Sequence, residues 1–292
     1  MRDSVRGKRL ALSGQVGELP HRLRHPGLIR VALALTMLPL TAHRSPLTAQ
    51  IQDNSFLLEE AYNQERGVVQ HISTFAFSSG QDWGYSFTQE WPLGGIRHQL
   101  SYTIPIQRND AMGTGLGDIA LNYRYQLAGN PEAKFVSAPR LSVLLPTGSE
   151  DRGRGAGGVG VQANLPLSLV LSSDIVTHWN AGITLTPAAR NALDAEATTT
   201  GLNLGASAVW LLRPTLNLLV ETLWLSEEAV LGEGTTQREE TAVISPGIRA
   251  AFDLAGDLQV VPGFAYTIFL SPDEAEDEAF LYLSFEHPFK RQ

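Results

Sequence analysis

The chain has no cysteine among its 292 residues and no apolar run of the length that a membrane-spanning helix requires. Without cysteine, disulfides and thiolate metal sites are excluded. Without about 18 consecutive apolar residues, a helical membrane protein is excluded as well. Hydrophobic residues still make up 43% of the sequence. At this length the chain can hold one large domain or two small ones.

Positive charge is scarce after residue 49. The first 49 residues hold eight of the 22 basic residues and two of the 30 acidic ones, which leaves 14 basic against 28 acidic, a net charge of −14. Binding to nucleic acid depends on lysine and arginine that neutralise phosphates. The sequence therefore predicts a protein that does not bind nucleic acid.

The N-terminus has the pattern of an export signal. A short apolar core, Val31–Ala42, follows three arginines and ends shortly before Thr48-Ala49. This core is too short to span a membrane and has the length of a signal-peptide core. We expect residues 1–49 to be a signal peptide with its lead-in, removed on export. A basic tail that is not exported is the alternative.

A period-two alternation dominates the sequence after residue 66. Its clearest example runs from Trp83 to Trp91, where large or aromatic side chains alternate with Gly84, Ser86, Thr88 and Glu90. Side chains alternate across a β-strand, so each such segment has one apolar face and one polar face. Segments of about ten residues with this pattern are typical of membrane-spanning β-barrels. We therefore predict an all-β, antiparallel, up-and-down transmembrane barrel.

Twelve strands account for the alternating segments, and an even number is typical of bacterial single-chain barrels. Five prolines fall inside these strands, although proline cannot donate to a strand ladder. The predicted strands are 66–78, 82–92, 96–107, 117–128, 134–146, 157–171, 174–187, 200–213, 215–226, 239–253, 257–270 and 278–289. The prolines are Pro105, Pro139, Pro166, Pro246 and Pro262.

The connections predict the orientation of the barrel. Those after the even-numbered strands are tight, as at Gly129-Asn130-Pro131, whereas those after the odd-numbered strands are mostly long and polar, as at 146–156. Outer-membrane barrels have short periplasmic turns and long external loops. Both termini of the barrel, 66–292, are therefore expected in the periplasm, together with a short N-terminal segment, 50–65. The predicted location is the outer membrane of a Gram-negative cell.

All five tryptophans fall on the face assigned to lipid. Trp83 and Trp91 lie roughly 20 Å apart along the membrane normal in a tilted strand, near the height of the apolar band that aromatic girdles flank. The predicted girdle is Trp83, Trp91, Trp179, Trp210 and Trp224. The last strand alternates toward Phe289, which resembles the terminal signal that barrel-assembly machinery reads. The expected partners are thus this machinery, outer-membrane lipid and lipopolysaccharide.

Three stretches together resemble a known family. They are Gly115-Leu116-Gly117-Asp118 with 122–125 (NYRY), Leu144–Gly148 (LLPTG) and His178–Gly182 (HWNAG). The set is similar to the outer-membrane transporters grouped under the meta-pathway of phenol degradation, over most of the chain after residue 60. The resemblance implies an outer-membrane barrel and leaves the substrate open.

The alternation of the strands predicts that acidic, basic and amide side chains face the lumen. Isolated buried charge is costly, so they are expected to be paired or hydrated. The predicted lumen residues are Arg97, Arg124, Arg140, Arg249, Glu90, Asp118, Glu221, His178 and Asn180. Inward glycines, among them Gly182, Gly205, Gly247 and Gly263, would leave space between them.

Our functional hypothesis is a channel that passes small molecules, aromatic or hydrophobic ones included, by passive diffusion. The alternatives are an envelope-interaction barrel with a filled lumen and ligand-binding loops, and an outer-membrane lipid hydrolase. The hydrolase would need a paired histidine and serine, for which His71 and Ser73 share a face. No cofactor and no metal site are predicted, and the acidic run at 273–278 is interpreted as a solvated external loop.

Overall fold

Fifteen β-strands and one short helical turn form the described part of the chain, residues 54–78, 82–130, 133–270 and 277–289 of a computed structural model. None of these residues belongs to a helix that is long and apolar enough to cross a membrane. The elements are β1 (Val68–Phe77), β2 (Trp83–Pro92), β3 (His98–Asn109), β4 (Gly113–Leu116), β5 (Ile119–Tyr125), β6 (Phe135–Ser137), β7 (Arg140–Leu145), η1 (Glu150–Arg152), β8 (Gly160–Val170), β9 (Ile175–Arg190), β10 (Glu196–Arg213), β11 (Leu216–Gly232), β12 (Thr235–Ala250), β13 (Phe252–Leu254), β14 (Leu258–Phe269) and β15 (Glu278–Pro288).

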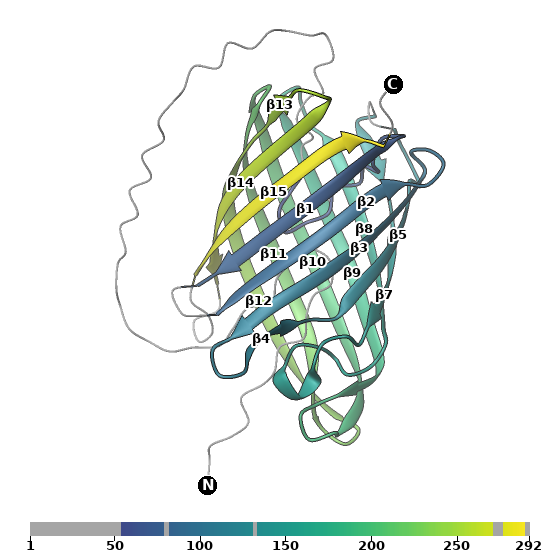
Figure 1. The fold of residues 1–292 in the computed structure, drawn as a ribbon, viewed down its shortest axis with the longest axis vertical. Coiled ribbons are helices and arrows are strands. Elements are labelled where there is room, and N and C mark those ends of the chain that lie inside the picture. The colour runs from purple at the N-terminus through teal and green to yellow at the C-terminus, as the bar shows by residue number, and fades with distance from the viewer. Residues whose placement is uncertain (1–53, 79–81, 131–132, 271–276, 290–292) are drawn as a thin grey trace.

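The strands close into one antiparallel barrel (Figure 1). Strand β1 pairs with both β2 and β15, and β12 pairs with both β11 and β14. The described strands therefore form a closed ring without a free edge strand. Three barrel strands are interrupted, as β4/β5, β6/β7 and β12/β13, so that the fifteen described segments form twelve barrel strands. The predicted all-β barrel of twelve strands is confirmed.

The five prolines lie at interruptions of the hydrogen-bond ladder. Pro105 faces the β4/β5 break, where its carbonyl accepts from the amide of Gly117 at 2.9 Å. Pro139 and Pro166 lie at the β6/β7 break. Pro262 lies opposite the β12/β13 break, and the β12–β14 ladder has no bridge at Pro246. Proline has no amide hydrogen to donate, and each of the five lies beside a break in the ladder on one side, although Pro105, Pro166, Pro246 and Pro262 stay paired on the other side.

Burial alternates as the sequence predicted. In β2 the residues from Gly84 to Glu90 with even numbers are buried and their odd-numbered neighbours are partly exposed. The outer face carries exposed leucine, valine, isoleucine and aromatic side chains on many strands, such as Leu204 at 53% and Leu281 at 45%. A continuous apolar outer surface on a closed barrel matches the lipid-facing side of membrane barrels.

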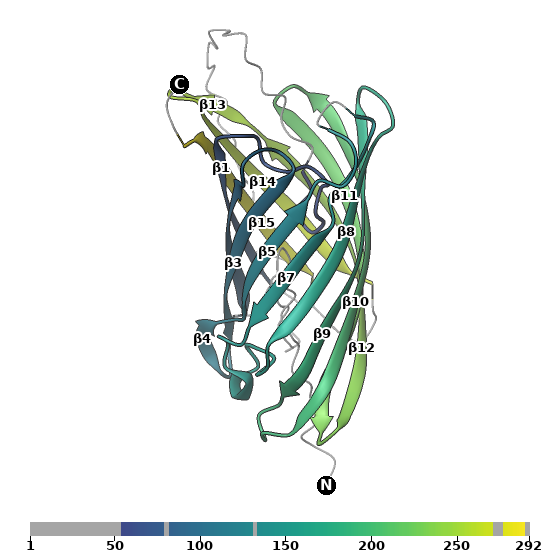
Figure 2. The ribbon, with the colours of Figure 1, turned by 90° about the vertical axis from the view of Figure 1, so that its right-hand side faces the viewer.

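The two ends of the barrel differ. One end, called here the short-turn end, carries the connections near residues 93–97, 171–174, 214–215 and 255–257. The opposite long-loop end carries 110–118, 146–159 and the hairpin tips of β9–β12, whose strands are 16 to 18 residues long against 10 for β1 and β2. The long β9–β12 wall extends beyond the shorter strands (Figure 2). Residues 1–53 and 271–276, which include the predicted signal peptide and most of the acidic run, lie outside the described residues.

The described stretch before β1, residues 54–64, lies inside the barrel, which corrects our expectation of a periplasmic segment at 50–65 for these residues. From Asn54 to Gln64 every residue but Tyr62 is buried, although the stretch has no regular secondary structure. Its side chains and main chain contact β9–β12, β14 and β15 on one side and β3, β5 and β7 on the other. We call residues 54–65 the lumen segment.

Candidate functional site

Glu221 of β11 anchors the start of the lumen segment. Three successive backbone amides, those of Phe56, Leu57 and Leu58, donate to its carboxylate at 3.0 to 3.2 Å. Consecutive amides that converge in this way form an anion-binding nest. Glu221 is fully buried, so these donors replace the water that its charge would otherwise require.

Glu59 anchors the middle of the lumen segment to the opposite wall. Its carboxylate accepts from Arg140 Nε at 2.7 Å and from Arg124 Nη2 at 3.1 Å. Asn164 of β8 adds an amide donor at 2.8 Å to the same carboxylate. The main chain of Glu59 is held as well, because Asn180 accepts from its amide and donates to its carbonyl. Glu59 is thus paired with two arginines and two amides.

The lumen segment then turns toward β1 through further side-chain bonds. The amide of Ala61 donates to Ser168 Oγ at 2.9 Å, and this hydroxyl also bonds to His178 Nδ1 at 2.7 Å. The amide of Gln64 donates to Gln99 Oε1 at 2.6 Å. The barrel wall therefore holds an irregular backbone by satisfying its amides one after another.

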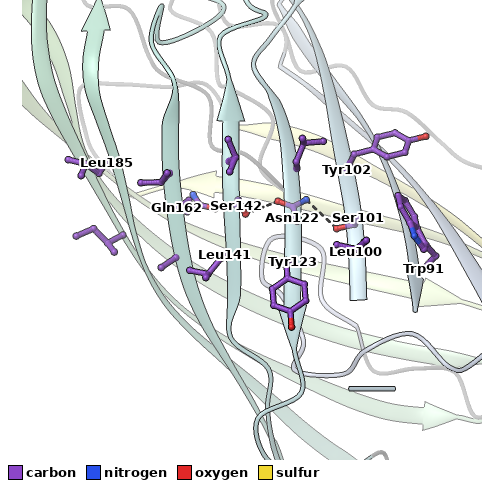
Figure 3. Close-up of a pocket in the computed structure, with 15 residues that line it drawn as sticks. Trp91, Leu100, Ser101, Tyr102, Asn122, Tyr123, Leu141, Ser142, Gln162 and Leu185 are labelled. Carbon is purple, nitrogen blue, oxygen red and sulfur yellow. Dashed lines mark hydrogen bonds between the residues drawn. The ribbon is translucent and has the colours of Figure 1, made fainter. Parts of the chain in front are cut away.

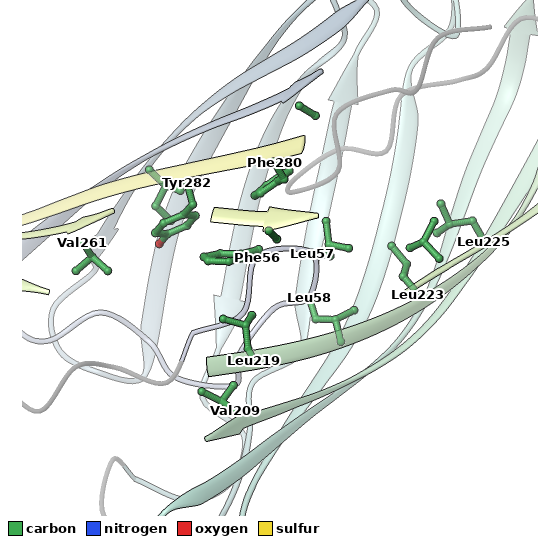
Figure 4. Close-up of a cluster of buried hydrophobic side chains, with 14 of the residues drawn as sticks. Phe56, Leu57, Leu58, Val209, Leu219, Leu223, Leu225, Val261, Phe280 and Tyr282 are labelled. Atoms are coloured by element: carbon green, nitrogen blue, oxygen red, sulfur yellow. The ribbon is translucent and has the colours of Figure 1, made fainter. Parts of the chain in front are cut away.

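Apolar contacts complete the seat of the lumen segment. Phe56 packs on Tyr282 and Phe280, with ring centroids 5.1 and 5.8 Å apart (Figure 4). Three of the inward glycines that the sequence analysis interpreted as open space, Gly205, Gly247 and Gly263, receive these side chains, whereas Gly182 lies against Asn164 and Asn203 of the wall. A Cβ on Gly247 would lie 2.8 Å from the Phe56 ring, and one on Gly263 or Gly205 would overlap Phe56 or Leu58.

The wall also holds the first described residue of the segment. Arg249 of β12 donates to the carbonyl of Asn54 at 2.6 Å and lies over the Tyr282 ring, 5.4 Å from its centroid. Arg249 is 2% exposed. Both ends of the stretch 54–59 are therefore fixed by charged side chains of the wall.

Most of the predicted lumen residues point inward, and the structure brings them together around the lumen segment. Those that line the lumen are Glu90, Arg124, Arg140, His178, Asn180, Glu221 and Arg249. Arg97 is a correction, because it lies exposed in the turn before β3, which starts only at His98. Glu90 accepts from Gln99 at 2.8 Å and so belongs to the same polar network.

Asp118 acts at the long-loop end instead of in the mid-lumen. Its carboxylate accepts from the amides of Gly148 at 2.9 Å and Ala156 at 2.7 Å, and so closes the loop 146–156. Burial raises the pKa of Asp118, while these amide bonds lower it in part. Thr147 bridges the same two stretches, since its hydroxyl donates to the carbonyl of Gly117 at 2.8 Å. The two sequence motifs at 115–118 and 144–148 thus form one clasp.

Around the lumen segment, the lumen has two different walls. One wall is apolar and comes from β1, β11, β12, β14 and β15. The other carries hydroxyl and amide groups from β8, β9 and β10. The apolar wall includes Ile72, Ala76, Leu223, Leu225, Val243, Ala265 and Phe280. The polar wall includes Gln162, Thr184, Thr186, Thr199 and Asn203.

Sequence reasoning missed this apolar wall and the lumen segment. An available signal was the run Phe56–Tyr62 (FLLEEAY), which is too apolar for an exposed linker and carries two carboxylates. A second signal was the number of arginines assigned to the lumen, because each buried guanidinium requires a counter-charge. A third signal was the pair Leu223 and Leu225, which are apolar although they fall on the inward face, where the alternation predicts polar side chains.

The outer face bears the predicted tryptophans. Trp179 and Trp210 are 49% and 50% exposed, and Trp83 packs on Phe75 with ring centroids 5.5 Å apart. An apolar depression of about 810 Å³ lies on the outside of β3–β9, lined by side chains such as Tyr123 and Leu141. Figure 3 shows the inner-face network beneath it, where Asn122 bonds to Ser101 and Ser142.

His71 and Ser73 make separate contacts on the outer face. His71 Nε2 lies 3.2 Å from His287 Nε2, and Ser73 Oγ lies 3.2 Å from the Tyr85 hydroxyl. The His–Ser pair that the hydrolase alternative needs is thus not formed by these two residues. Among the described residues, no three histidine or acidic side chains group as a metal site.

Comparisons with known proteins agree with this architecture. A family model described as "Putative MetA-pathway of phenol degradation" matches residues 61–264. An outer membrane channel from Pseudomonas putida F1 superposes with a TM-score of 0.58 at 14% identity, over 78% of this chain and 97% of that one. The NanC porin superposes with a TM-score of 0.50 at 7% identity, over 76% and 99%. These likenesses show a shared barrel fold. No curated protein matches the sequence.

Proposed function

Since the chain belongs to the family described as the MetA-pathway of phenol degradation, we propose that it is an outer-membrane channel that passes small molecules, aromatic and hydrophobic ones included, by passive diffusion. The observation that carries this proposal is the lining of the lumen, where an apolar wall lies beside a wall of hydroxyl and amide groups. A small aromatic solute has both kinds of surface, and recognition sites for such molecules combine an apolar lining with a few polar groups.

The proposed path enters at the long-loop end and meets the lumen segment near the short-turn end. Passage then requires the segment to move, because Glu221 and the Glu59 cluster hold it across the lumen. In this scheme Arg124, Arg140 and Arg249 influence which solutes pass, since they are the positively charged side chains that contact the lumen segment. The proposed orientation places the short-turn end in the periplasm, after export through a cleaved signal peptide and insertion by barrel-assembly machinery.

The test is single-channel recording of the protein, purified from membranes and reconstituted in planar bilayers, over a series of salt concentrations and voltages. Discrete current steps are expected, and the reversal potential in a salt gradient should shift in the Arg140→Gln variant. A gel shift between heated and unheated samples controls for folding. A folded barrel that gives no current steps at any voltage would overturn the channel proposal.

One observation favours a second candidate, a barrel with a filled lumen whose external loops bind a partner. The lumen segment is buried and bonded at nearly every residue, as expected of a permanent plug. The two candidates differ in whether the segment leaves its seat. Hydrogen exchange of residues 54–65 as slow as that of the barrel strands would favour the plug, and faster exchange would favour the channel.

A further inference from the structure

Glu59 is held by Arg124 and Arg140 as a bound carboxylate ligand would be. Its two oxygens face Nε of Arg140 at 2.7 and 2.9 Å, and Nη2 of the same guanidinium lies 2.6 Å from Oε1. The Nε–Nη2 edge of one guanidinium thus holds both oxygens of the carboxylate, and this planar, charge-assisted match is what gives arginine its specificity for carboxylates. Arg124 Nη2 approaches Glu59 from a second side at 3.1 Å.

The barrel wall, and not the lumen segment, orients this arginine. Arg140 Nη1 donates to Asn122 Oδ1 at 2.9 Å and to Ser142 Oγ, and its Nη2 donates to Gln162 Oε1 at 2.7 Å. Asn122 and Gln162 belong to the two neighbouring strands, β5 and β8, and Ser142 belongs to β7 itself; all three side chains are buried on the lumen side. The site is therefore already formed in the wall before any carboxylate arrives, which reduces the cost of binding one.

The net charge around Arg124 and Arg140 changes from negative to positive when the segment leaves, because Glu59 and Glu60 leave with it. With the segment in place, Arg124 and Arg140 face Glu59, with Glu60 3.9 Å from Arg124. Glu90 stays on the wall and interacts with Arg124. Once residues 54–65 leave, the side chains bonded to Arg140 are neutral, and among the described residues Glu90 is the one carboxylate that interacts with both Arg124 and Arg140. Two guanidinium groups then share one negative charge, and an uncompensated buried guanidinium is costly, so the emptied site favours a further anion.

We propose that Arg124 and Arg140, with Asn164, form a binding site for small-molecule monocarboxylates, and that Glu59 occupies this site as an internal substitute ligand. A solute with a carboxylate takes the place of Glu59 and so favours the displaced state of the lumen segment. The inference rests on the proposed channel function, because it identifies the class of solute that opens the path. Neutral aromatic molecules of the same size have no group that competes with Glu59.

The test titrates the full, folded protein with sodium benzoate and follows cleavage by chymotrypsin within 54–65, identified by mass spectrometry. Benzyl alcohol serves as the neutral probe, and sodium chloride at equal concentration controls for ionic strength. A ligand that binds only the displaced state multiplies its population by one plus the ratio of ligand concentration to dissociation constant. Benzoate at about ten times that constant should therefore raise cleavage about tenfold, and the two controls should leave it unchanged.

Two variants measure the site without relying on cleavage. Calorimetric binding of benzoate should become about tenfold tighter in Glu59→Gln, because the internal competitor is weakened by at least one charge-assisted bond. Glu65→Gln, on the exposed end of the segment, is the matched control and should bind as the wild type does. In Arg140→Gln, binding should be lost while the gel shift of the folded barrel remains.

The outcomes separate this inference from the channel proposal. Benzoate-dependent cleavage in a protein that carries no current supports the carboxylate site and overturns the channel. Current steps with cleavage that benzoate does not change support the channel and overturn the site. Equal effects of chloride and benzoate also overturn the site, since they mean that salt alone loosens the segment.

Discussion

Replacing Glu221 by glutamine should release the lumen segment while leaving the barrel intact. Three amides donate to this carboxylate within 3.2 Å. A hydrogen bond to a charged group contributes about 1.5–3 kcal/mol, against about 0.5–1.5 kcal/mol for a neutral pair. The amide of glutamine keeps one acceptor and turns a donor toward the segment. Part of the loss is offset because a neutral side chain is easier to bury.

The net loss for the seated segment is then about 1–3 kcal/mol, which corresponds to a change of about 5- to 150-fold in the equilibrium between seated and displaced states. Cleavage of a briefly exposed segment follows the population of the exposed state when opening and closing are fast. The assay is the rate of chymotrypsin cleavage within 54–65 on the folded barrel. Glu221→Gln should raise this rate by the same factor.

Glu228→Gln is the matched control, because it makes the same change on the same strand at a position that bonds Thr200 and Arg238. It should leave the cleavage rate within the lumen segment unchanged. A rate within twofold of wild type for Glu221→Gln would refute the assignment of Glu221 as the anchor.

Three further predictions concern the glycine seat, the outer face and the loop clasp. Gly263→Ala should displace Phe56, because the added Cβ overlaps its ring, and chymotrypsin cleavage in the lumen segment should rise; an unchanged rate would contradict this seat. Leu204→Arg should destabilise the barrel in lipid by about 2–4 kcal/mol in reversible urea unfolding, the cost of a cation at the lipid face. Leu193→Arg, in a loop at 86% exposure, should cost nothing comparable, and equal effects would refute the lipid-facing assignment. Asp118→Asn should speed tryptic cleavage of the loop 146–156, because one of the two hydrogen bonds that this side chain accepts from backbone amides is lost. The urea midpoint for unfolding of the barrel should not change. A loop as resistant to trypsin as in the wild type would argue against the clasp.

The barrel was predictable from the sequence because period-two alternation is a local signal. Each residue of a strand faces either lipid or lumen, so Trp83 and Gly84 already determine the faces of β2. The orientation of the barrel was predictable for the same reason, because the residues that form tight turns are recognisable within three or four positions of the sequence. The prolines also follow local rules, although only the pairing shows that Pro262 faces the β12/β13 break.

The lumen segment was not predictable in the same way. Its backbone follows no period, and its partners lie up to 195 residues away, as between Asn54 and Arg249. Alternation told which way Arg140 and Glu221 point but not what they bind. The inward glycines illustrate the difficulty, because an empty position such as Gly205 is compatible with a channel or with a seat for Leu58. Only the three-dimensional arrangement distinguishes these.

Single-channel current recorded side by side from the complete protein and from a variant without residues 54–65 tests the central claim most directly. The account predicts discrete steps for both proteins, with a larger conductance and a stronger preference for anions in the variant, where the anionic segment no longer covers Arg124 and Arg140. Heat-modifiable, folded barrels that give the same conductance with and without the segment would contradict the claim that the lumen segment controls this path.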